Sequence, residues 1–418
     1  MKKKILIVDD SALMRRVLCD IINSDNRFEV VEYAIDGADG FKKICAKTYD
    51  AVVLDVYMPK MTGLEMLEEM QKSKVYANVL MASTTTGEGA KETIRALDLG
   101  AVDFIRKPEN VADARHEEFK KRFLDLLDVV TKANKNYMAR AGAHFTPDTA
   151  HKGTTFVSRY DVNFHTGRPG AAAGSRAGDS EAGKTVRPAD GRPSLSRFGT
   201  GSTKSSLTTG GRTDIPPASE SHPRVPGKKI VAIASSTGGP KALQEVIPRL
   251  PGNLKAPVLL VQHMPKGFTA SLASRLNELS DVEVTEAKEG EAIVSGHVYI
   301  APGGAHLKAS KTAGTMKLHL TDEPSREGVK PCANYMYESL AGCGYDEVVC
   351  VVLTRMGADG TAGIVHLKKS QKIHVIAQNE ESCTVYGMPR SIVEGKLADE
   401  VVPLAQVAEQ IIKNVGVC

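Results

Sequence analysis

The sequence predicts an α/β protein built from two domains, each with its own parallel, doubly wound sheet. Short apolar runs typical of buried strands alternate with amphipathic helix patterns in residues 3–108, and the same alternation returns in residues 229–418. Such alternation is typical of parallel strands joined by helical crossovers. At 418 residues the chain is also too long for one ordinary core and suits two domains plus connecting sequence.

In the first domain, which we place at residues 1–140, five strand-like runs are separated by helix-like segments. The first helix pattern repeats apolar residues such as Val17 and Ile21 at helical spacing. A further amphipathic helix, from about Ala112 to Lys135, closes the domain. The expected strands are "KILIVD", "FEVVEYA", "AVVLDV", "VLMAS" and "VDFIRK", and the helices include "SALMRRVLCDIINSD", "GADGFKKICAK", a segment from Leu64 and "AKETIRALDLG".

The composition changes after Arg140. Residues 141–228 are rich in Gly, Ser, Thr, Arg and Pro and have no apolar period, as in "RPGAAAGSRAGDSEAGKTVRPADGRPS". Such a segment buries too little apolar surface to offset the loss of chain entropy, so we predict a disordered linker that provides solubility and reach.

The second domain is expected at residues 229–418, again with alternating strands and helices and its own parallel sheet. The predicted strands are "KIVAIA", "PVLLVQ", "HVYIAP", "MKLHLT", "EVVCVVLT" and "KIHVIAQ". The predicted helices are "GPKALQEVIPRL", "FTASLASRLNELS", "CANYMYESLAGC", "GTAGIVHLKKS", "MPRSIVEGK" and "AQVAEQIIKNV".

Composition narrows the class of protein. The hydrophobic share of 42% and charged share of 25% are normal for a globular protein. Much of the positive excess behind the net charge of +4 lies in the low-complexity middle segment, so this charge gives no indication of a nucleic-acid surface. The seven cysteines are scattered without a CxxC pair, which indicates reduced thiols. The apolar run in "MKKKILIVDD" is too short for a signal core, and no segment approaches the roughly 18 residues of a membrane span. We therefore expect a cytoplasmic protein without membrane insertion.

Polar residues follow the strands of the first domain. Asp9 and Asp10 end the first strand, Asp55 ends the third, and Ser83 and Lys107 end two others. The carboxyl ends of parallel strands share one crevice, and converging carboxylates attract a hard cation such as Mg²⁺. One carboxylate could then attack a phosphoryl group while Lys107 and Ser83 steady its oxygens. Each aspartate alone could be a turn former or a helix cap, but five matched residues at four strand ends argue against that interpretation.

The motifs "ILIVDDSALMR", "LDVYMPKMTGLEML" and "KP" resemble those of response-regulator receiver domains, which are flavodoxin-like. The resemblance covers residues 3–108. It implies phosphorylation of Asp55, Mg²⁺ held by Asp10 and Asp55 with help from Asp9, and a partner histidine kinase. It also implies a switch residue at Ser83 and an aromatic at Phe104 that changes rotamer on activation.

The stretch "ASSTGG" follows the first strand of the second domain, and two further chemical groups follow other strands. Ser236 lies after "KIVAIA", His263 after "PVLLVQ", and Asp359 in the loop "TRMGADG". The crevice rule allows these three to form a nucleophile, its base and an orienting acid. A-S-S-T-G matches the G-x-S-x-G turn with Ser236 at the apex, while Ser235 would point elsewhere. Backbone N–H groups of the following helix and of "RMGADG" are candidates for an oxyanion hole.

Other interpretations of these residues remain open at this point. A Gly-rich turn often holds phosphate, although neither GxGxxG nor GxxxxGK[ST] is present. His263 could be a core histidine, and Asp359 could be a turn residue. His306 in "APGGAH" is a competing base near another strand end.

The motifs "IASSTGGPKAL", "VQHMPKGFT", "YIAPGGAHL", "LTRMGADGTAG" and "AQNEESCTVYGMPR" together resemble the CheB family. These are chemotaxis response regulators with a C-terminal protein-glutamate methylesterase. The resemblance implies Ser236 as nucleophile, His263 as base and Asp359 as orienting acid, with no cofactor in the catalytic domain. It further implies hydrolysis of glutamyl methyl esters on chemoreceptors, release of methanol, and deamidation of selected receptor glutamines.

Two departures from the family pattern stand out. Arg355 and Ala358 occupy positions where family members usually have Gly and Asn, so Arg355 could crowd the cleft or bias which receptor helix docks. The linker is also longer than usual. We further hypothesise that the unphosphorylated first domain covers Ser236. The competing classes are a DNA-binding response regulator, disfavoured because no helix-turn-helix or basic recognition helix follows the linker, and a non-catalytic signalling scaffold.

Overall fold

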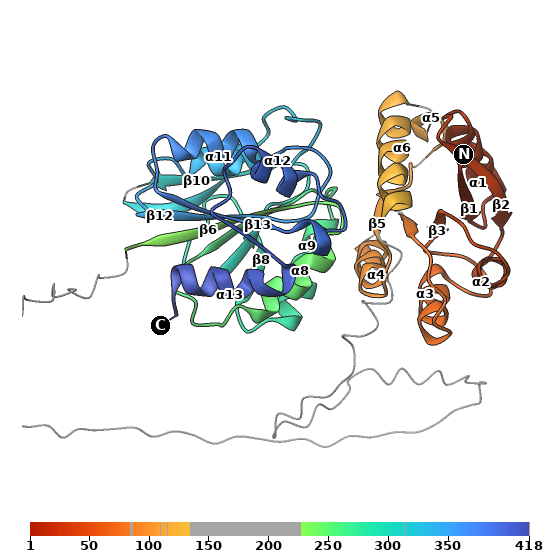
Figure 1. Cartoon of the computed structure of the whole chain (residues 1–418), viewed down its shortest axis with the longest axis horizontal. Coiled ribbons are helices and arrows are strands. Elements are labelled where there is room, and N and C mark those ends of the chain that lie inside the picture. Colours follow the sequence, from red (N-terminus) through yellow and green to blue (C-terminus); the bar gives the residue numbers. More distant parts are fainter. Residues whose placement is uncertain (84–86, 109, 115, 134–226, 313, 418) are drawn as a thin grey trace, which may run out of the picture. The chain divides into compact units, whose positions relative to one another are not determined.

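The structure is a computed structural model that describes residues 1–83, 87–108, 110–114, 116–133, 227–312 and 314–417 (Figure 1). The predicted linker at 141–228 lies outside the described residues except for Gly227 and Lys228. None of the helices in the described ranges is long and apolar enough to cross a membrane.

The N-terminal domain is a five-stranded parallel sheet in the order β2-β1-β3-β4-β5. All five predicted strands form, and the order reverses between β1 and β3, which creates a crevice at their carboxyl ends. The strands are β1 Lys3–Val8, β2 Phe28–Ala34, β3 Ala51–Asp55, β4 Val79–Ser83 and β5 Asp103–Arg106; the helices are α1 Ala12–Asn23, α2 Gly37–Ala46, α3 Gly63–Lys72, α4 Gly87–Asp98, α5 Val111–Ala114 and α6 Glu117–Lys132.

Local sequence explains where the first helices begin. Ser11 accepts a hydrogen bond from the Met14 N–H at the start of α1, and Asp36 caps α2 in the same way. Thr62 and Glu65 form a reciprocal capping box on α3. The single closing helix expected over residues 112–135 is instead two helices, because the chain turns to extended backbone at His116 before α6 begins.

The C-terminal domain contains a seven-stranded parallel sheet in the order β14-β13-β12-β6-β7-β9-β8. Here the order reverses between β6 and β12, so the loops after these two strands flank a second crevice. The strands are β6 Lys229–Ser235, β7 Val258–Gln262, β8 Glu283–Glu286, β9 His297–Ile300, β12 Glu347–Val352, β13 Ile373–Gln378 and β14 Glu400–Val402; the helices are α8 Gly239–Val246, α9 Phe268–Leu279, α10 Ala333–Ser339, α11 Thr361–Lys368, α12 Met388–Glu394 and α13 Leu404–Val415, with short 3₁₀ turns at Ile247–Arg249 and Glu380–Ser382.

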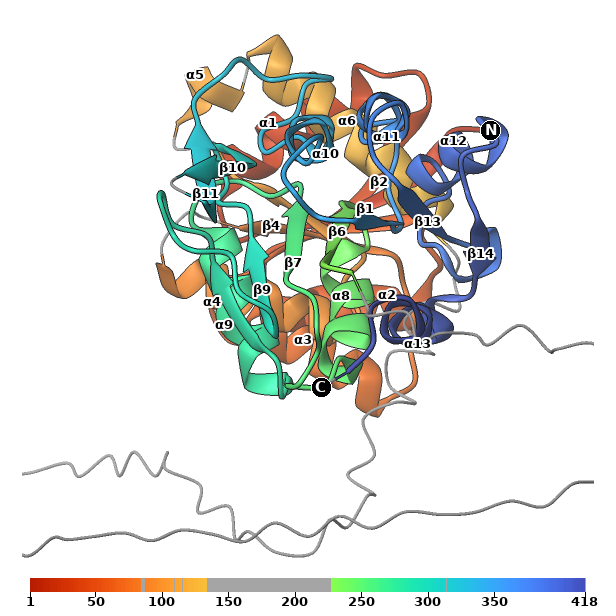
Figure 2. The same ribbon diagram turned by 90° about the vertical axis from the view of Figure 1, so that its left-hand side faces the viewer.

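Helices cover both faces of this sheet (Figure 2). Alternate residues of the buried strand β6 separate the two layers: Val231 and Ile233 pack with α8, α9 and α13, whereas Ile230 and Ala232 pack with α10, α11 and α12. All six predicted helices form, because each has one apolar side that the sheet buries.

The strand predictions for this domain were incomplete. Segment "MKLHLT" forms strand β11 (Thr315–Thr321), but it pairs antiparallel with β10 (His306–Thr312) and lies outside the parallel sheet. β8, β10 and β14 had not been predicted. β8 and β14 are edge strands of three or four residues, so they carry little apolar pattern of their own.

Candidate functional sites

Three carboxylates meet at the carboxyl end of the N-terminal sheet. Asp9 and Asp10 follow β1, Asp55 ends β3, and carboxylate oxygens of the three lie within 4.8 Å of one another. Lys107 Nζ lies 2.6 Å from Asp9 Oδ2 and 2.6 Å from Asp55 Oδ2. One ammonium group cannot neutralise three carboxylates, and hard oxygen ligands are those that divalent cations such as Mg²⁺ prefer. The donor set therefore fits a hard divalent cation.

Burial is the largest influence on Asp55 in this crevice. It raises the pKa of the Asp55 carboxyl to about 6, while Lys107 opposes the rise and Asp9 adds to it. A buried carboxylate that is costly to ionise without a counter-charge is expected at a site that binds a cation and accepts a phosphoryl group.

Ser83 and Phe104, the other two residues predicted for this domain, contact groups other than the three carboxylates. Ser83 is fully buried; its hydroxyl accepts from Thr93 Oγ1 at 2.6 Å and lies 3.3 Å from the Gly89 carbonyl oxygen, so it is tied to α4. Phe104 is buried and stacks on Phe268 of α9 with ring centroids 4.6 Å apart.

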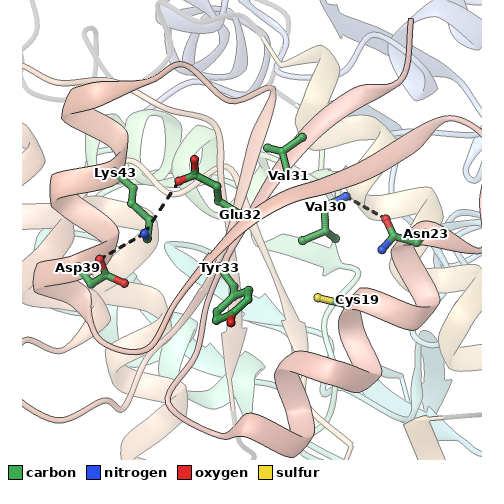
Figure 3. Close-up of a pocket in the computed structure, with 8 residues that line it drawn as sticks. All are labelled: Cys19, Asn23, Val30, Val31, Glu32, Tyr33, Asp39 and Lys43. Carbon is green, nitrogen blue, oxygen red and sulfur yellow. Dashed lines mark hydrogen bonds and ion pairs between the residues drawn. The ribbon is translucent and has the colours of Figure 1, made fainter.

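A separate hollow lies beside the edge strand β2 (Figure 3). Its walls include Tyr33, Glu32 and the Lys43 side chain, which pairs with Asp39 at 3.4 Å. None of the residues predicted for the acidic crevice lines this hollow, so it does not belong to the candidate site.

In the C-terminal domain, the two adjacent serines have different environments. Ser235 is fully buried at the end of β6, and its hydroxyl donates to Gln262 Oε1 at 2.7 Å. Ser236 is partly exposed, and its carbonyl oxygen accepts from Gln262 Nε2 at 2.9 Å. Gly238 has a φ of 73°, which favours glycine, and a side chain on Gly239 would collide with the Gln262 amide. The small residues therefore allow the tight turn that presents Ser236.

His263 and Asp359 form a buried pair. His263 follows β7, and its Nε2 lies 2.8 Å from Asp359 Oδ2. Burial chiefly lowers the pKa of His263 to about 4; the charge of Arg355 lowers it further, whereas Asp359 opposes the change. Within the part of the chain that the structure describes, His263 Nδ1 is buried without a hydrogen-bond partner. A neutral imidazole with one free nitrogen is a competent proton acceptor.

Asp359 is held by donors from the start of α10. Its carboxylate accepts from the Ala333 N–H at 2.7 Å, the Asn334 N–H at 3.0 Å and Cys332 Sγ at 3.0 Å, in addition to His263. Burial alone would raise its pKa, but these hydrogen bonds prevail and hold the pKa of Asp359 well below its usual value. The side chain is thus a fixed carboxylate and does more than form a turn.

Both ring nitrogens of His306, the competing base, lie within hydrogen-bond distance of backbone groups. Its Nδ1 accepts from the Cys332 N–H at 3.1 Å, and its Nε2 faces the carbonyl oxygens of Glu323 at 3.2 Å and Pro324 at 3.3 Å. Both ring nitrogens are therefore used in holding the loop before α10, which leaves neither for chemistry.

Sequence reasoning missed Gln262 and Cys332, and it singled out Arg355 without predicting its partner. Gln262 bridges the two serines, Cys332 donates to Asp359, and Arg355 lies 3.6 Å from Asp359 Oδ2. A polar residue closing the apolar run "PVLLVQ" was a signal for Gln262, whereas nothing local marked Cys332; Arg355 was marked by its departure from the family pattern. Ala358 is exposed, and the structure assigns it no particular contact beyond its carbonyl bond from Thr361.

Contacts also join the two domains, which belong to one compact unit. Asp98 of α4 accepts from Arg275 Nε of α9 at 3.0 Å and from the Gln244 side chain of α8. Phe104 of β5 stacks on Phe268, which lies on the same helix α9 as Arg275. The positive charge of Arg122, on α6 of the N-terminal domain, acts on His263.

An acidic crevice on a five-stranded parallel sheet, followed by an α/β domain with a buried His–Asp pair beside a serine turn, defines a response regulator with an enzyme-like output domain. Family models agree: the one described as response regulator receiver domain matches residues 5–117, and the one described as CheB methylesterase matches residues 231–411. The chain belongs to the CheB family of protein-glutamate methylesterases/protein-glutamine glutaminases, which confirms the predicted resemblance and excludes the DNA-binding alternative.

Named relatives match over nearly the whole chain. The protein-glutamate methylesterase/protein-glutamine glutaminase of Geobacillus kaustophilus is 35% identical over 413 residues, covering 99% of both chains. The protein of the same name from Pyrococcus horikoshii is 35% identical over 416 residues, covering 100% of this chain and 94% of the relative. Among solved structures, the Thermotoga maritima CheB methylesterase catalytic domain is 42% identical, covers 44% of this chain and 98% of its own, and has a TM-score of 0.43.

Proposed function

We propose that this protein hydrolyses glutamyl methyl esters on methyl-accepting chemotaxis receptors, releasing methanol, and deamidates selected receptor glutamines. The observation that carries the proposal is the buried His263–Asp359 pair, with a free imidazole nitrogen, in the crevice that also presents Ser236. The names of the full-length relatives give the chemical groups acted on, which are glutamate methyl esters and glutamines of proteins.

In the proposed reaction, the Ser236 hydroxyl attacks the ester carbonyl while His263 takes its proton at Nδ1. Asp359 holds the Nε2–H of the imidazole and stabilises the imidazolium that forms. Backbone N–H groups of the turn after Ser236 and of the loop before Asp359 are the donors we expect for the oxyanion.

Collapse of the tetrahedral adduct breaks the C–O bond to methoxide, which leaves as methanol with the proton from His263. Water then attacks the acyl-serine with His263 again as base, and this second step releases Ser236 and the glutamate carboxylate. Deamidation of glutamine follows the same sequence with ammonia as the leaving group.

The N-terminal domain receives the signal in this proposal. A histidine kinase donates a phosphoryl group to Asp55, and Asp10 and Asp55, helped by Asp9, would hold Mg²⁺. The cation, when bound, neutralises charge on the carboxylates and the transferring group. Lys107, already 2.6 Å from Asp55, steadies a phosphoryl oxygen, and Ser83 is the proposed switch residue.

Regulation follows from the contacts between the domains. We propose that the unphosphorylated N-terminal domain restricts access to Ser236 and that phosphorylation of Asp55 weakens the contacts of Asp98 with Arg275 and of Phe104 with Phe268. The positive charge of Arg122 on α6 contributes to lowering the pKa of His263, which supports this proposal because a group of the N-terminal domain acts on the base. We also propose that the protein is cytoplasmic, which fits a signalling role with a kinase as phosphodonor and receptors as substrate.

The test is methanol release from methylated receptor membranes by the full-length protein, with and without a small-molecule phosphodonor. Wild type should release methanol faster with the phosphodonor, and Ser236→Ala should release none. Equal release by wild type and Ser236→Ala would refute the assignment of the nucleophile. No release by either protein would favour the non-catalytic scaffold.

A further inference from the structure

Arg355 is a buried cation in the proposed catalytic centre. It lies in the loop after β12, four residues before Asp359, and is only 8% exposed. The backbone holds it in place, since its N–H donates to the Val385 carbonyl at 3.0 Å and its carbonyl accepts from the Met388 N–H at 2.9 Å. A fixed backbone and a buried side chain leave the guanidinium little freedom to move away.

The guanidinium is directed at the carboxylate that serves the base. Arg355 Nη1 lies 3.6 Å from Asp359 Oδ2 and 3.6 Å from the Met388 sulfur. The same Asp359 oxygen also accepts from His263 Nε2 at 2.8 Å and from the Ala333 N–H at 2.7 Å. Arg355 therefore forms an ion pair inside the site.

Two positive groups cannot both be fully neutralised by one carboxylate. The guanidinium is charged at every ordinary pH, whereas the imidazole can remain neutral. Because Asp359 is shared with Arg355, it would balance the charge of an imidazolium at His263 only in part in this buried site.

We propose that Arg355 is a positioning residue that acts through Asp359, keeping His263 in its neutral, proton-accepting form at mildly acidic pH. This inference rests on the proposed role of His263 as base. The titratable or charged groups that act on His263 are Asp359, Arg355 and Arg122. Those that act on Arg355 are Asp359, Glu327 and the Cys332 thiol. Burial of the imidazole and the charge of Arg355 both lower the pKa of His263. Removing the arginine should therefore raise this pKa but leave it below the ordinary value for histidine.

The direct test is an NMR titration of full-length protein labelled with ¹³C-histidine, with the His263 signal assigned by its loss in His263→Gln. Arg355→Met retains side-chain length and the contact with Met388 but removes the charge. In this variant we expect the titration midpoint of His263 to rise by about one pH unit. Arg355→Lys should restore most of the wild-type behaviour, because it restores the charge.

Arg390→Met is the matched control, since Arg390 is an exposed arginine of the same domain that pairs with Glu394. It should leave the His263 midpoint unchanged. An unchanged His263 midpoint in folded Arg355→Met would overturn the proposal. If Arg355→Met does not fold, Arg355→Lys and Arg355→Gln are compared instead. Equal departures of their His263 midpoints from wild type would then overturn the proposal.

A second readout separates this proposal from the proposed function. If His263 is the base, the acid limb of the kcat/KM profile should move upward with the NMR midpoint, with KM little changed. A shifted NMR midpoint combined with full activity of Ser236→Ala would refute the catalytic assignment and leave the Arg355 inference standing. An unshifted midpoint combined with an inactive Ser236→Ala would refute the Arg355 inference alone.

Discussion

Replacing Asp359 with asparagine tests the centre of the site, because the change removes charge and hydrogen-bond acceptors without changing size. Two groups donate to each carboxylate oxygen: His263 Nε2 and the Ala333 N–H to Oδ2, and Cys332 Sγ and the Asn334 N–H to Oδ1. An amide offers one oxygen and one NH₂ group. Whichever way it turns, two buried donors lose their acceptor.

Each buried donor left without an acceptor costs about 1–3 kcal/mol, so Asp359→Asn should lower the free energy of unfolding by about 2–6 kcal/mol. That is a large part of the roughly 5–15 kcal/mol of a typical domain. Urea unfolding followed by circular dichroism measures the change. Asp322→Asn is the matched control, because Asp322 is almost fully exposed and pairs only with Lys330 among the described residues.

The loss of unfolding free energy in Asp359→Asn should also depend on pH in a predictable direction. Because the pKa of Asp359 is lowered in the folded protein, its carboxylate contributes stability above the unfolded pKa of about 4. That contribution is lost as the pH falls from there toward the lower folded value. The gap between wild type and Asp359→Asn should therefore be widest near neutral pH and narrow below about pH 4.

The catalytic effect is measured as methanol release by the fraction that remains folded. If Asp359 orients the base, Asp359→Asn should lower kcat by about three to four orders of magnitude, by analogy with the Asp of the Ser-His-Asp triad. A stability change below about 1 kcal/mol, no larger than in Asp322→Asn, would refute the hydrogen-bond reasoning. Near-normal kcat in folded protein would refute the catalytic reasoning.

Three further predictions concern neighbouring groups. Ser235→Ala should keep methanol release, whereas Ser236→Ala should lose it, because the Ser235 hydroxyl is buried against Gln262; equal losses in both would contradict this. Arg275→Ala removes the ion pair with Asp98 and should raise methanol release by unphosphorylated protein several-fold, and unchanged basal release would count against occlusion. The pKa of the Cys332 thiol is raised to about 12, so iodoacetamide should label Cys332 only after denaturation, as mass spectrometry of the peptide can show; labelling of the folded protein would be inconsistent with its burial.

The strand ends were predictable from the sequence because buried strands and the polar residues that close them are local patterns. The apolar runs before Asp9, Asp55, Ser236 and His263 identified four strands, and the parallel-sheet rule placed their ends at shared crevices. The family motifs then made the class of protein and the fold specific. These predictions are confirmed by the sheet orders and the family matches. The catalytic roles of Ser236, His263 and Asp359 stay predictions until the variants are measured.

Other features depend on contacts between residues distant in sequence, and local patterns do not determine such contacts. Strand β11 was predicted, but its pairing with β10 in a separate hairpin is set by partners across the fold. The direction of the Arg355 side chain is set by Asp359 and by the backbone of Val385 and Met388. The sequence by itself thus determined the two domains and the types of residue at their crevices. Only the tertiary structure decided which of those residues meet, because burial and charge pairing arise after distant segments have packed together.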